Sequence, residues 1–368
     1  MANNTRSRLH ECYYDKSGVG SYGGVDALYR KLQRDKHPIT RGAVKTWLSG
    51  QETYTLHKNA RKRFKRRMTI VASAGMQWQA DLADVSNLEK QNDGARYILT
   101  VIDVLSKYAF AEALRDKTGS RVAAAFKHIF SKGRVPVKLQ TDAGKEFLNR
   151  PLQNLLKHHG VHHFITHTEV KAAVVERFNR TLKSKLWRYF TAYNTQRYVD
   201  ILQTFIDVYN DSYHRSIKMP PRAVTSENSL SAWRNLYAGR LSEKIKKASF
   251  RVGDHVRVSK LKGVFTKGYQ QSFTDEIFIV AKASVKEGVY IYQLNDYAGE
   301  VVSGNFYTEE LQKVIDDPQR LYRVEKIIQS KGKGSKKQHL VKWHGWPEKF
   351  NSWVNAASLE DLKSRDDP

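Results

Sequence analysis

The chain has 368 residues and a formal net charge of +26, because 63 lysines and arginines face 37 aspartates and glutamates. Apolar residues make up 40% of the chain and aromatic residues 11%, so a largely disordered protein is excluded and about two to four folded domains are expected. A positive excess this large predicts a polyanionic partner, with nucleic acid the first candidate. A basic protein without such a partner is the alternative.

Cysteine content and hydropathy exclude further classes of protein. Cys12 is the single cysteine, which excludes an intramolecular disulfide and any zinc site that needs two cysteines, so we expect no zinc. Residues 1–6 lack the apolar core of a signal peptide, and no stretch of about eighteen apolar residues exists. The sequence thus predicts a soluble intracellular protein without a membrane partner.

Residues 1–67 predict a helical N-terminal domain followed by a basic linker. Residues 23–32 are amphipathic, and residues 39–48 form a second predicted helix with Thr40 as its N-cap. The turn between them contains Pro38, and two short helices joined in this way are typical of a helix-turn-helix, whose second helix can enter a DNA groove. A helix pair that only packs together is an equally open interpretation.

The linker is strongly basic. No carboxylate occurs from Thr53 to Ala80, whereas Arg61, Arg63 and Arg66 belong to a dense cluster of lysines and arginines. Such a cluster can contact DNA phosphates, act as a nuclear localisation signal or remain a solvated linker. The sequence alone does not separate these three interpretations.

Residues 70–225 alternate strand and helix patterns, which predicts an α/β domain. Three strands in early succession, followed by alternating helices and strands, predict a mixed sheet flanked by helices. The predicted strands are the segment that ends at Asp81 and residues 97–104, 108–114, 137–142 and 161–166; the predicted helices are residues 120–130, 150–159, 172–190 and 198–209.

Three acidic residues are the catalytic candidates in this domain. Asp81 and Asp142 each end a hydrophobic run of strand type. Glu176 lies near the start of a predicted helix, where Arg180 and Lys183 follow at i+4 and i+7 and therefore share its face. A solvated stripe of paired charges would explain the helix by itself. Three carboxylates brought together by a fold can instead hold two Mg²⁺ ions.

A resemblance is carried by four segments: Trp78–Asp81 (WQAD), Ile102–Tyr108 (IDVLSKY), Thr141–Phe147 (TDAGKEF) and Val175–Lys183 (VERFNRTLK). Together they resemble the catalytic core of retroviral and retrotransposon integrases, and more closely that of the integrases of self-synthesising Polinton/Maverick DNA transposons. The resemblance extends through nearly the whole chain, including residues 54–58 and 263–269.

The resemblance implies an RNase H-like fold in which Asp81, Asp142 and Glu176 form an acidic triad around two Mg²⁺ or Mn²⁺ ions. Phosphodiester transfer needs an activated nucleophile and stabilisation of the charge on the leaving oxygen, and two metal ions supply both. In the implied arrangement Asp81 bridges both ions, Asp142 holds one and Glu176 holds the other. The residues carried over by position as contacts to the transposon DNA end are Asn179, Arg180 and Lys183.

Other candidate ligands fit less well. Asp103 is predicted to be a turn or cap residue and Glu146 a flanking contact, because neither occupies the triad position of the family. Retroviral-type integrases mostly carry an N-terminal zinc domain with two histidines and two cysteines, which this chain cannot form. No shared transition-metal site is expected for the histidines that straddle a helix end, a turn and a strand, namely His158, His159, His162, His163 and His167.

Residues 226–247 are predicted to form a mostly helical, basic connector. Residues 248–315 are predicted to form a small all-β domain. Short alternating runs at residues 250–258, 277–280, 290–294 and 301–304 are separated by Gly, Asn and Asp. This segment is similar to the SH3-like C-terminal barrel of integrases, which implies contact with the DNA backbone. The residues that would supply positive charge are Arg251, Arg257, Lys260, Lys262 and Lys267; a plain scaffold role is the alternative.

The last segment, residues 316–368, resembles a chromodomain. The matching residues are 322–328, 340–346 and 351–353. By position, Tyr322, Trp343 and Trp346 fall on the aromatic cage of the family, which binds methyl-lysine by cation–π attraction. For Trp353, a plain core position is the simpler interpretation. The segment departs from the family at residues 354–355, which are Val-Asn where the family often has Glu-Pro.

The sequence therefore predicts a multidomain α/β protein: an N-terminal helical domain, an RNase H-like mixed-sheet catalytic core, an SH3-like β-barrel and a C-terminal chromodomain. Its predicted function is that of a transposon integrase, a DDE-type polynucleotidyl transferase. Such an enzyme would process DNA 3′ ends and join them to target DNA, as a homo-oligomer in the nucleus that also binds a histone methyl-lysine. Two alternatives stay open: a domesticated, non-catalytic DNA- and chromatin-binding protein, and an RNase H-like nuclease that acts only by hydrolysis.

Overall fold

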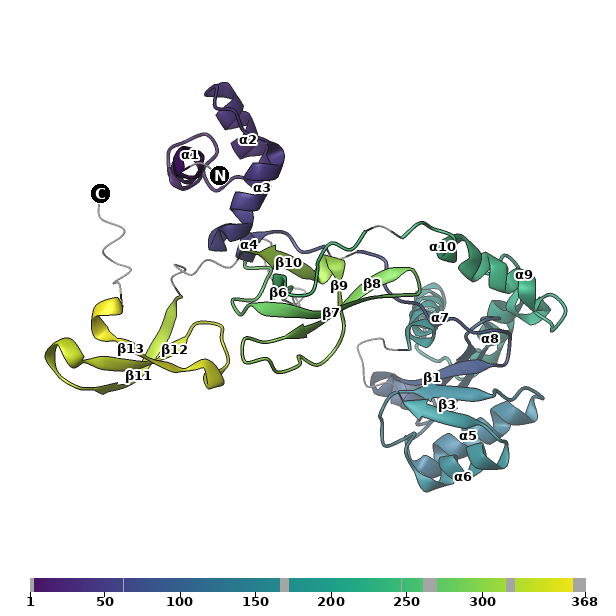
Figure 1. Ribbon diagram of the computed structural model, residues 1–368. Helices are drawn as coiled ribbons and strands as arrows, with labels where there is room; N and C mark the ends of the chain where they lie inside the picture. Colours follow the sequence, from purple (N-terminus) through teal and green to yellow (C-terminus); the bar gives the residue numbers. More distant parts are fainter. Residues whose placement is uncertain are drawn as a thin grey trace. The chain divides into compact units, whose positions relative to one another are not determined.

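The computed structural model describes residues 3–61, 63–165, 172–245, 247–260, 270–315 and 322–359 (Figure 1). The contacts within the chain divide it into two compact units, one formed by Arg67–Ile245 and the other by Met1–Arg66 together with Lys246–Pro368. Among the described residues, no helix combines the length and the apolar character needed to cross a membrane.

The unit Arg67–Ile245 is built on a five-stranded mixed sheet with the strand order β3-β2-β1-β4-β5. The pairs β1–β2 and β2–β3 are antiparallel, and the pairs β1–β4 and β4–β5 are parallel. The predicted mixed sheet is thus confirmed. Its strands are β1 (Gln77–Asp84), β2 (Tyr97–Asp103), β3 (Ala109–Leu114), β4 (Lys138–Thr141) and β5 (His162–Ile165).

Helices cover both faces of this sheet (Figure 1). Each of the four predicted helices exists with ends shifted by a few residues, and α7 runs three residues beyond the predicted end at Phe190. Lys171, just before its predicted start, lies outside the described residues. The helical segments are η1 (Ser86–Gln91), α5 (Gly119–Ser131), α6 (Arg150–His158), α7 (Ala173–Tyr193), α8 (Leu202–Asp211), α9 (Ser229–Trp233), η3 (Arg234–Ala238) and α10 (Gly239–Leu241).

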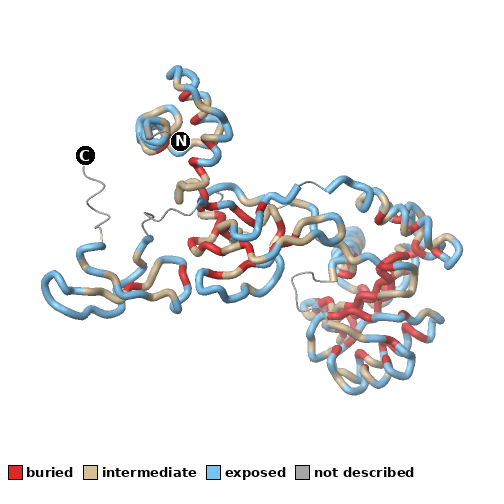
Figure 2. Tube along the Cα trace, viewed as in Figure 1, coloured by how far each residue is buried: buried red, intermediate tan, exposed pale blue. Residues whose placement is uncertain are grey.

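Alternation along β1 distributes its side chains between two cores. Trp78 and Ala80 pack in one core with residues of α5 and α6, whereas Ala83 packs in the other with residues of α7 and α8. Figure 2 shows these buried residues concentrated along the sheet. Because successive side chains of a strand point to opposite faces, Gln79 and Asp81 belong to the face that α7 covers.

In the other unit, the N-terminal residues form four helices. Their core includes Leu9, Leu28 and Trp47, all buried. The predicted cap is confirmed, because the hydroxyl of Thr40 accepts a hydrogen bond from the Ala43 N–H at 3.1 Å. The first and last of these helices were not predicted from the sequence. The four helices are α1 (Asn3–Tyr14), α2 (Val25–Arg34), α3 (Arg41–Gly50) and α4 (Glu52–His57).

The same unit holds an antiparallel five-stranded sheet with the order β10-β6-β7-β8-β9. The predicted all-β segment is confirmed, but the strand predicted at residues 301–304 is wrong. Val301 is 74% exposed and makes only one bridge, to Asn295, while the chain pairs later, in β9 and β10. The strands are β6 (His255–Val258), β7 (Phe278–Lys286), β8 (Val289–Asn295), β9 (Phe306–Tyr307) and β10 (Leu311–Val314).

A separate three-stranded antiparallel sheet follows near the C-terminal end of the described chain. Its strands are β11 (Val324–Lys331), β12 (Gln338–Trp343) and β13 (Ser352–Asn355). Trp346, which follows β12, packs against Val314 of the five-stranded sheet and against Ile277, the residue just before β7. The two sheets of this unit therefore share a small apolar contact.

Candidate active site

Asp81 lies in the middle of β1 and is half-buried on the face covered by α7. Its Oδ1 accepts a hydrogen bond from the Leu82 N–H at 2.9 Å, and its Oδ2 accepts one from Nδ2 of Asn179 at 2.7 Å. Burial raises the pKa of Asp81, and the carboxylates of Asp142 and Glu176 raise it further, against the Leu82 N–H, which lowers it. Both of the other predicted acids thus act electrostatically on Asp81.

Asp142 follows β4 at the start of a tight turn. Its Oδ1 accepts a hydrogen bond from the Gly144 N–H at 3.1 Å. A Cβ atom at Gly144 would lie 2.7 Å from Cδ of Glu146 and 3.0 Å from Oδ1 of Asp142, so both side chains lie close to this glycine. Glu146 itself faces Lys117 at 3.9 Å. The backbone N–H of Gly144 therefore holds the Asp142 carboxylate in the turn.

Glu176 is exposed in the first turn of α7. The unpaired N–H groups at a helix N-terminus carry partial positive charge, which favours a carboxylate there. Arg180 is exposed one turn later, and Lys183 reaches the backbone carbonyl of Asp84 at 3.4 Å. One helix thus presents an acid and, beside it, two cations.

Asn179, which was predicted to contact DNA, is partly exposed and forms hydrogen bonds within the protein. Its Nδ2 donates to Asp81, and its Oδ1 accepts a hydrogen bond from the Thr100 hydroxyl at 2.6 Å. Both ends of the amide are therefore used inside the protein, where they fix the rotamer of the Asp81 carboxylate. The i+3 spacing from Glu176 was visible in the sequence, but this cross-strand contact with Thr100 was not.

The donor chemistry of the three acids fits a hard divalent cation, since carboxylate oxygens are the ligands that Mg²⁺ prefers. The positions of the side chains do not by themselves define a metal site. Among the residues that the structure describes, no three His, Cys, Asp or Glu side chains form a group that could hold a metal ion.

Asp103 is a structural residue, as the sequence indicated. It is buried, and its Oδ2 accepts hydrogen bonds from Nε1 of Trp78 at 3.1 Å and from the Gly75 N–H at 2.6 Å. Its Oδ1 accepts from the backbone N–H groups of Leu105 and Ser106. The carboxylate therefore holds the turn after β2.

The predicted DNA-contact residues outside the core differ in exposure. Arg61 and Arg63 are exposed, and Arg66 is exposed but pairs with Glu310 at 3.4 Å. Lys260 is bound to Asp275 at 3.1 Å. Lys262 and Lys267, which were predicted to supply further charge, lie outside the described residues.

Arg257 corrects the sequence-based expectation of DNA contact. Its side chain is fully buried, and Nη1 donates to the carbonyls of Thr274 at 2.7 Å and Asp275 at 2.6 Å. Its Nη2 lies 3.7 Å from a carboxylate oxygen of Glu52. A guanidinium enclosed in this way joins parts of its own unit and cannot reach a DNA phosphate.

The three predicted cage residues do come together. The ring of Tyr322 lies 6.0 Å from that of Trp343 and 5.7 Å from that of Trp346, both in edge-to-face geometry. Tyr322 is 38% exposed, whereas Trp346 is 9% exposed because it also packs against the five-stranded sheet. The core position expected for Trp353 is wrong: it is 37% exposed and carries the Lys331 ammonium over its ring.

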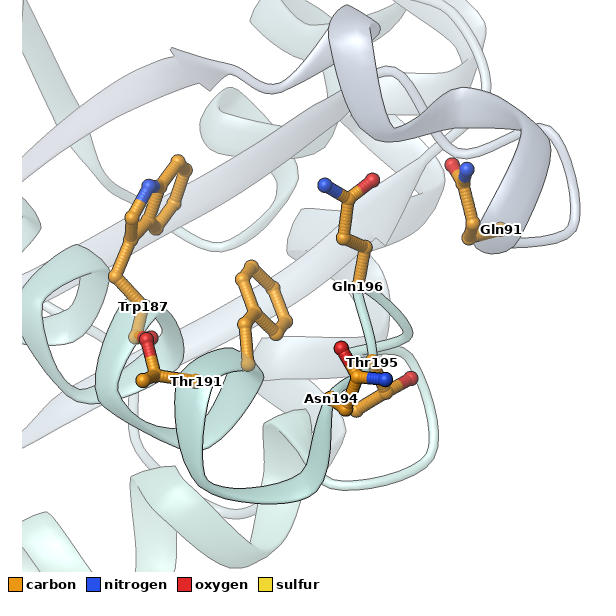
Figure 3. Close-up of a pocket in the computed structure, with 7 residues that line it drawn as sticks. Gln91, Trp187, Thr191, Asn194, Thr195 and Gln196 are labelled. Atoms are coloured by element: carbon orange, nitrogen blue, oxygen red, sulfur yellow. The ribbon is translucent and has the colours of Figure 1, made fainter.

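A pocket of about 600 Å³ lies away from the acids (Figure 3). Trp187 and Thr191 line it from α7, Gln196 from the segment that follows this helix, and Gln91 from η1. None of the three acids contributes to its wall. Its place at the far end of α7 separates it from the candidate active site.

Two segments match known domain families. Residues 72–169 match the integrase core domain, and residues 322–365 match the chromo (chromatin organisation modifier) domain. The mixed sheet, whose chain segments carry Asp81 and Asp142, thus belongs to an integrase core of RNase H-like fold, and α7 with Glu176 follows the matched residues. The chain combines this core with a C-terminal chromodomain.

Similar proteins support this assignment. An uncharacterized transposon-derived protein of Caenorhabditis elegans is 37% identical over 196 residues, which are 53% of this chain and 66% of the relative, just under two thirds of its length. The simian T-cell lymphotropic virus intasome, solved in complex with the PP2A regulatory subunit B56 gamma, contains a chain that is 13% identical. The match covers 81% of this chain and 97% of that chain, with a TM-score of 0.53, which indicates a shared fold.

Proposed function

We propose that this protein is a transposon integrase that processes DNA 3′ ends and joins them to target DNA. The observation that carries the proposal is the match of residues 72–169, which include Asp81 and Asp142, to the integrase core domain. The carboxylates of Asp142 and of Glu176, in the first turn of α7, both raise the pKa of Asp81, which supports a shared site. Within transposon integrases, the sequence resemblance favours the Polinton/Maverick type.

The residues of this chain would each perform a defined part of the reaction. Asn179 and the Leu82 N–H orient the carboxylate of Asp81. The turn at Gly144 holds Asp142, and the first turn of α7 presents Glu176. These three acids would hold Mg²⁺ or Mn²⁺, which when bound activates the attacking oxygen and stabilises the leaving oxygen.

Double-stranded DNA, both the transposon end and the target, is the proposed partner. The net charge of +26 and the exposed side chains of Arg61, Arg63 and Arg180 support it. If these cations contact phosphates, DNA affinity should fall steeply and linearly in log[salt]. An affinity that does not change with salt would contradict the proposal. Action on chromosomal DNA would place the protein in the nucleus, as a homo-oligomer that holds both transposon ends.

The chromodomain is proposed to bind a methylated lysine of a histone tail and so to bias the target. The edge-to-face contacts of the Tyr322 ring with Trp343 and Trp346 support these three residues as the aromatic walls of such a site. We expect Trp343→Ala to abolish binding of a trimethyl-lysine histone peptide without changing DNA binding. A wild-type protein that does not bind any such peptide would leave this module as a protein-contact or structural one.

A strand-transfer assay tests the proposed function. It uses a labelled transposon end, already processed, a plasmid target and Mg²⁺ or Mn²⁺. We expect joined product with wild type and with Glu146→Gln, which changes a neighbouring acid that faces Lys117, and no product with Glu176→Gln. Cleavage without joining would favour the hydrolytic nuclease. DNA binding with neither reaction would favour the domesticated binding protein.

A further inference from the structure

Gln79 connects all three elements that carry the acids. It lies on β1 and is 1% exposed. Its Oε1 accepts hydrogen bonds from the backbone N–H groups of Val174 at 3.0 Å and Val175 at 3.1 Å, in the first turn of α7. Its Nε2 donates to Oε1 of Gln140 on β4 at 2.9 Å. One amide thus bonds at the same time to β4 and to the start of α7.

The register of the sheet places these amides directly behind the acids. Gln79 and Gln140 are paired residues of the parallel strands β1 and β4. Asp81 and Asp142 follow two residues later on the respective chain segments. Since side chains two residues apart on a strand point to the same face, Gln79 lies one step behind Asp81 on β1. Gln140 lies on β4 two residues before Asp142, which directly follows that strand.

The start of α7 depends on this amide. The first N–H groups of a helix have no partner within the helix and need acceptors from elsewhere. The residue at the N-cap position, Ala172, has no side chain that could accept them. By contrast, α6 is capped locally, because Oδ1 of Asn149 accepts from the Leu152 N–H at 3.0 Å. The acceptor for α7 therefore comes from a strand about 95 residues earlier in the chain.

We propose that Gln79 is a positioning residue that sets the spacing of Asp81, Asp142 and Glu176 by clamping α7 and β4 to β1. This role rests on the proposed function, since it concerns the same three acids. A neutral amide suits the position because it both accepts from the helix and donates to Gln140. A carboxylate would still accept from the helix, but it would add a fourth negative charge beside acids that already repel one another.

Gln77 provides a matched control. It is another glutamine of β1, two residues earlier, and its Nε2 donates to the same Gln140 oxygen at 2.8 Å. In the part of the chain that the structure describes, its amide forms no hydrogen bond with α7. Gln77→Ala therefore removes a bond to β4 and leaves the contact with α7 intact, whereas Gln79→Ala removes both.

The first test is hydrogen exchange at the backbone amides of Val174 and Val175, which requires neither metal nor DNA. We expect exchange to be about tenfold to a hundredfold faster in Gln79→Ala than in wild type, since a partly buried N–H (Val174) and a buried one (Val175) lose their acceptor. Gln77→Ala should exchange as wild type does, and Gln79→Glu should restore the protection. Equal protection in Gln79→Ala and wild type would overturn the clamp. If Gln79→Ala unfolds, Gln79→Met keeps the volume and removes the acceptor.

The second test is Mn²⁺ affinity together with strand transfer. Groups that orient metal ligands typically change affinity or activity by about tenfold to a hundredfold when removed. We expect this loss for Gln79→Met in Mn²⁺ affinity and in kcat, with KM for DNA unchanged, and a much smaller loss for Gln77→Ala. Unchanged Mn²⁺ affinity and kcat in Gln79→Met would overturn the positioning role. An inactive wild type would instead overturn the proposed function, while the exchange test would still decide the clamp.

Discussion

Two aspartates of this protein, Asp81 in the integrase core and Asp275 in the other unit, are both withdrawn from solvent, yet their pKa values move in opposite directions. Burial raises the pKa of Asp81, and two neighbouring carboxylates add to the effect. Burial acts on Asp275 in the same sense, but its pKa is lowered by the hydrogen bond and charge of Lys260 and by the charges of Arg323 and His344.

The difference lies in where the compensating charge comes from. Asp275 receives Nζ of Lys260 at 3.1 Å and Nη2 of Arg323 at 2.5 Å, so the chain itself neutralises it. A Cβ at Gly345 would lie 2.5 Å from that of Asp275, so these groups are closely packed. Around Asp81 the amide of Asn179 orients the carboxylate without neutralising it. A buried acid left in this state is suited to an external cation.

The largest expected effect concerns Asp81 itself. Asp81→Asn should reduce strand transfer by about a thousandfold or more, because a ligand for the activating cation is lost. DNA binding, measured by fluorescence anisotropy, should stay within about twofold of wild type. Asp275→Asn should retain strand transfer in the folded protein. An Asp81→Asn variant that still transfers strands would contradict the assignment of Asp81 as a ligand of the activating cation.

The next effect in size is on stability. Asp275→Asn should lower the free energy of unfolding by about 2 kcal/mol at neutral pH, since partly exposed cations lose their partner. Because the folded pKa of Asp275 is below its ordinary value of 3.8, its contribution is present above that pH and is lost as the pH falls through the folded pKa. Urea unfolding at neutral and acid pH measures both. A difference in the free energy of unfolding between wild type and Asp275→Asn that becomes larger at acid pH would contradict this prediction.

A smaller effect is expected at Asn179. Asn179→Ala should reduce strand transfer by about tenfold, because the carboxylate of Asp81 loses the donor that fixes its rotamer. Thr100→Val, which removes the hydroxyl that orients Asn179, should reduce strand transfer by less than Asn179→Ala does. Single-turnover rates with a labelled DNA end measure both. Loss of DNA affinity in Asn179→Ala at an unchanged rate would restore the role of direct DNA contact.

The smallest effect is the pH dependence of Asp81. The pKa of Asp81 in the folded state is raised above the ordinary value of 3.8, so the folded protein keeps this proton to a higher pH than the unfolded chain does. The free energy of unfolding therefore falls as the pH rises from 3.8 to the folded pKa. In the absence of metal, Asp81→Asn should therefore melt at most a few degrees above wild type at pH 7. The difference should vanish below pH 3.8. Thermal unfolding at both pH values checks the sign.

Sequence reasoning was most successful where pattern and chemistry coincide. The alternation of apolar residues located the strands of the core, although β1 continues three residues past its predicted end at Asp81. Asp142 directly follows β4, as predicted. Contacts between side chains far apart in the chain could not be predicted from the sequence. The burial of Arg257 and the position of Gln79 between β4 and α7 depend on register and on partners far along the chain. The helix α1 was missed because its sequence, NNTRSRLHECYY, has few apolar residues and no acid in its first turn.

The most direct test of the comparison is the melting temperature as a function of Mn²⁺ concentration. A ligand that binds only the folded state stabilises it by about 1.4 kcal/mol at ten times its Kd. We predict that Mn²⁺ raises the melting temperature of wild type, raises that of Asp275→Asn by the same amount from a lower starting point, and leaves that of Asp81→Asn unchanged. An equal rise in Asp81→Asn would contradict the claim that this carboxylate is kept for a metal ion.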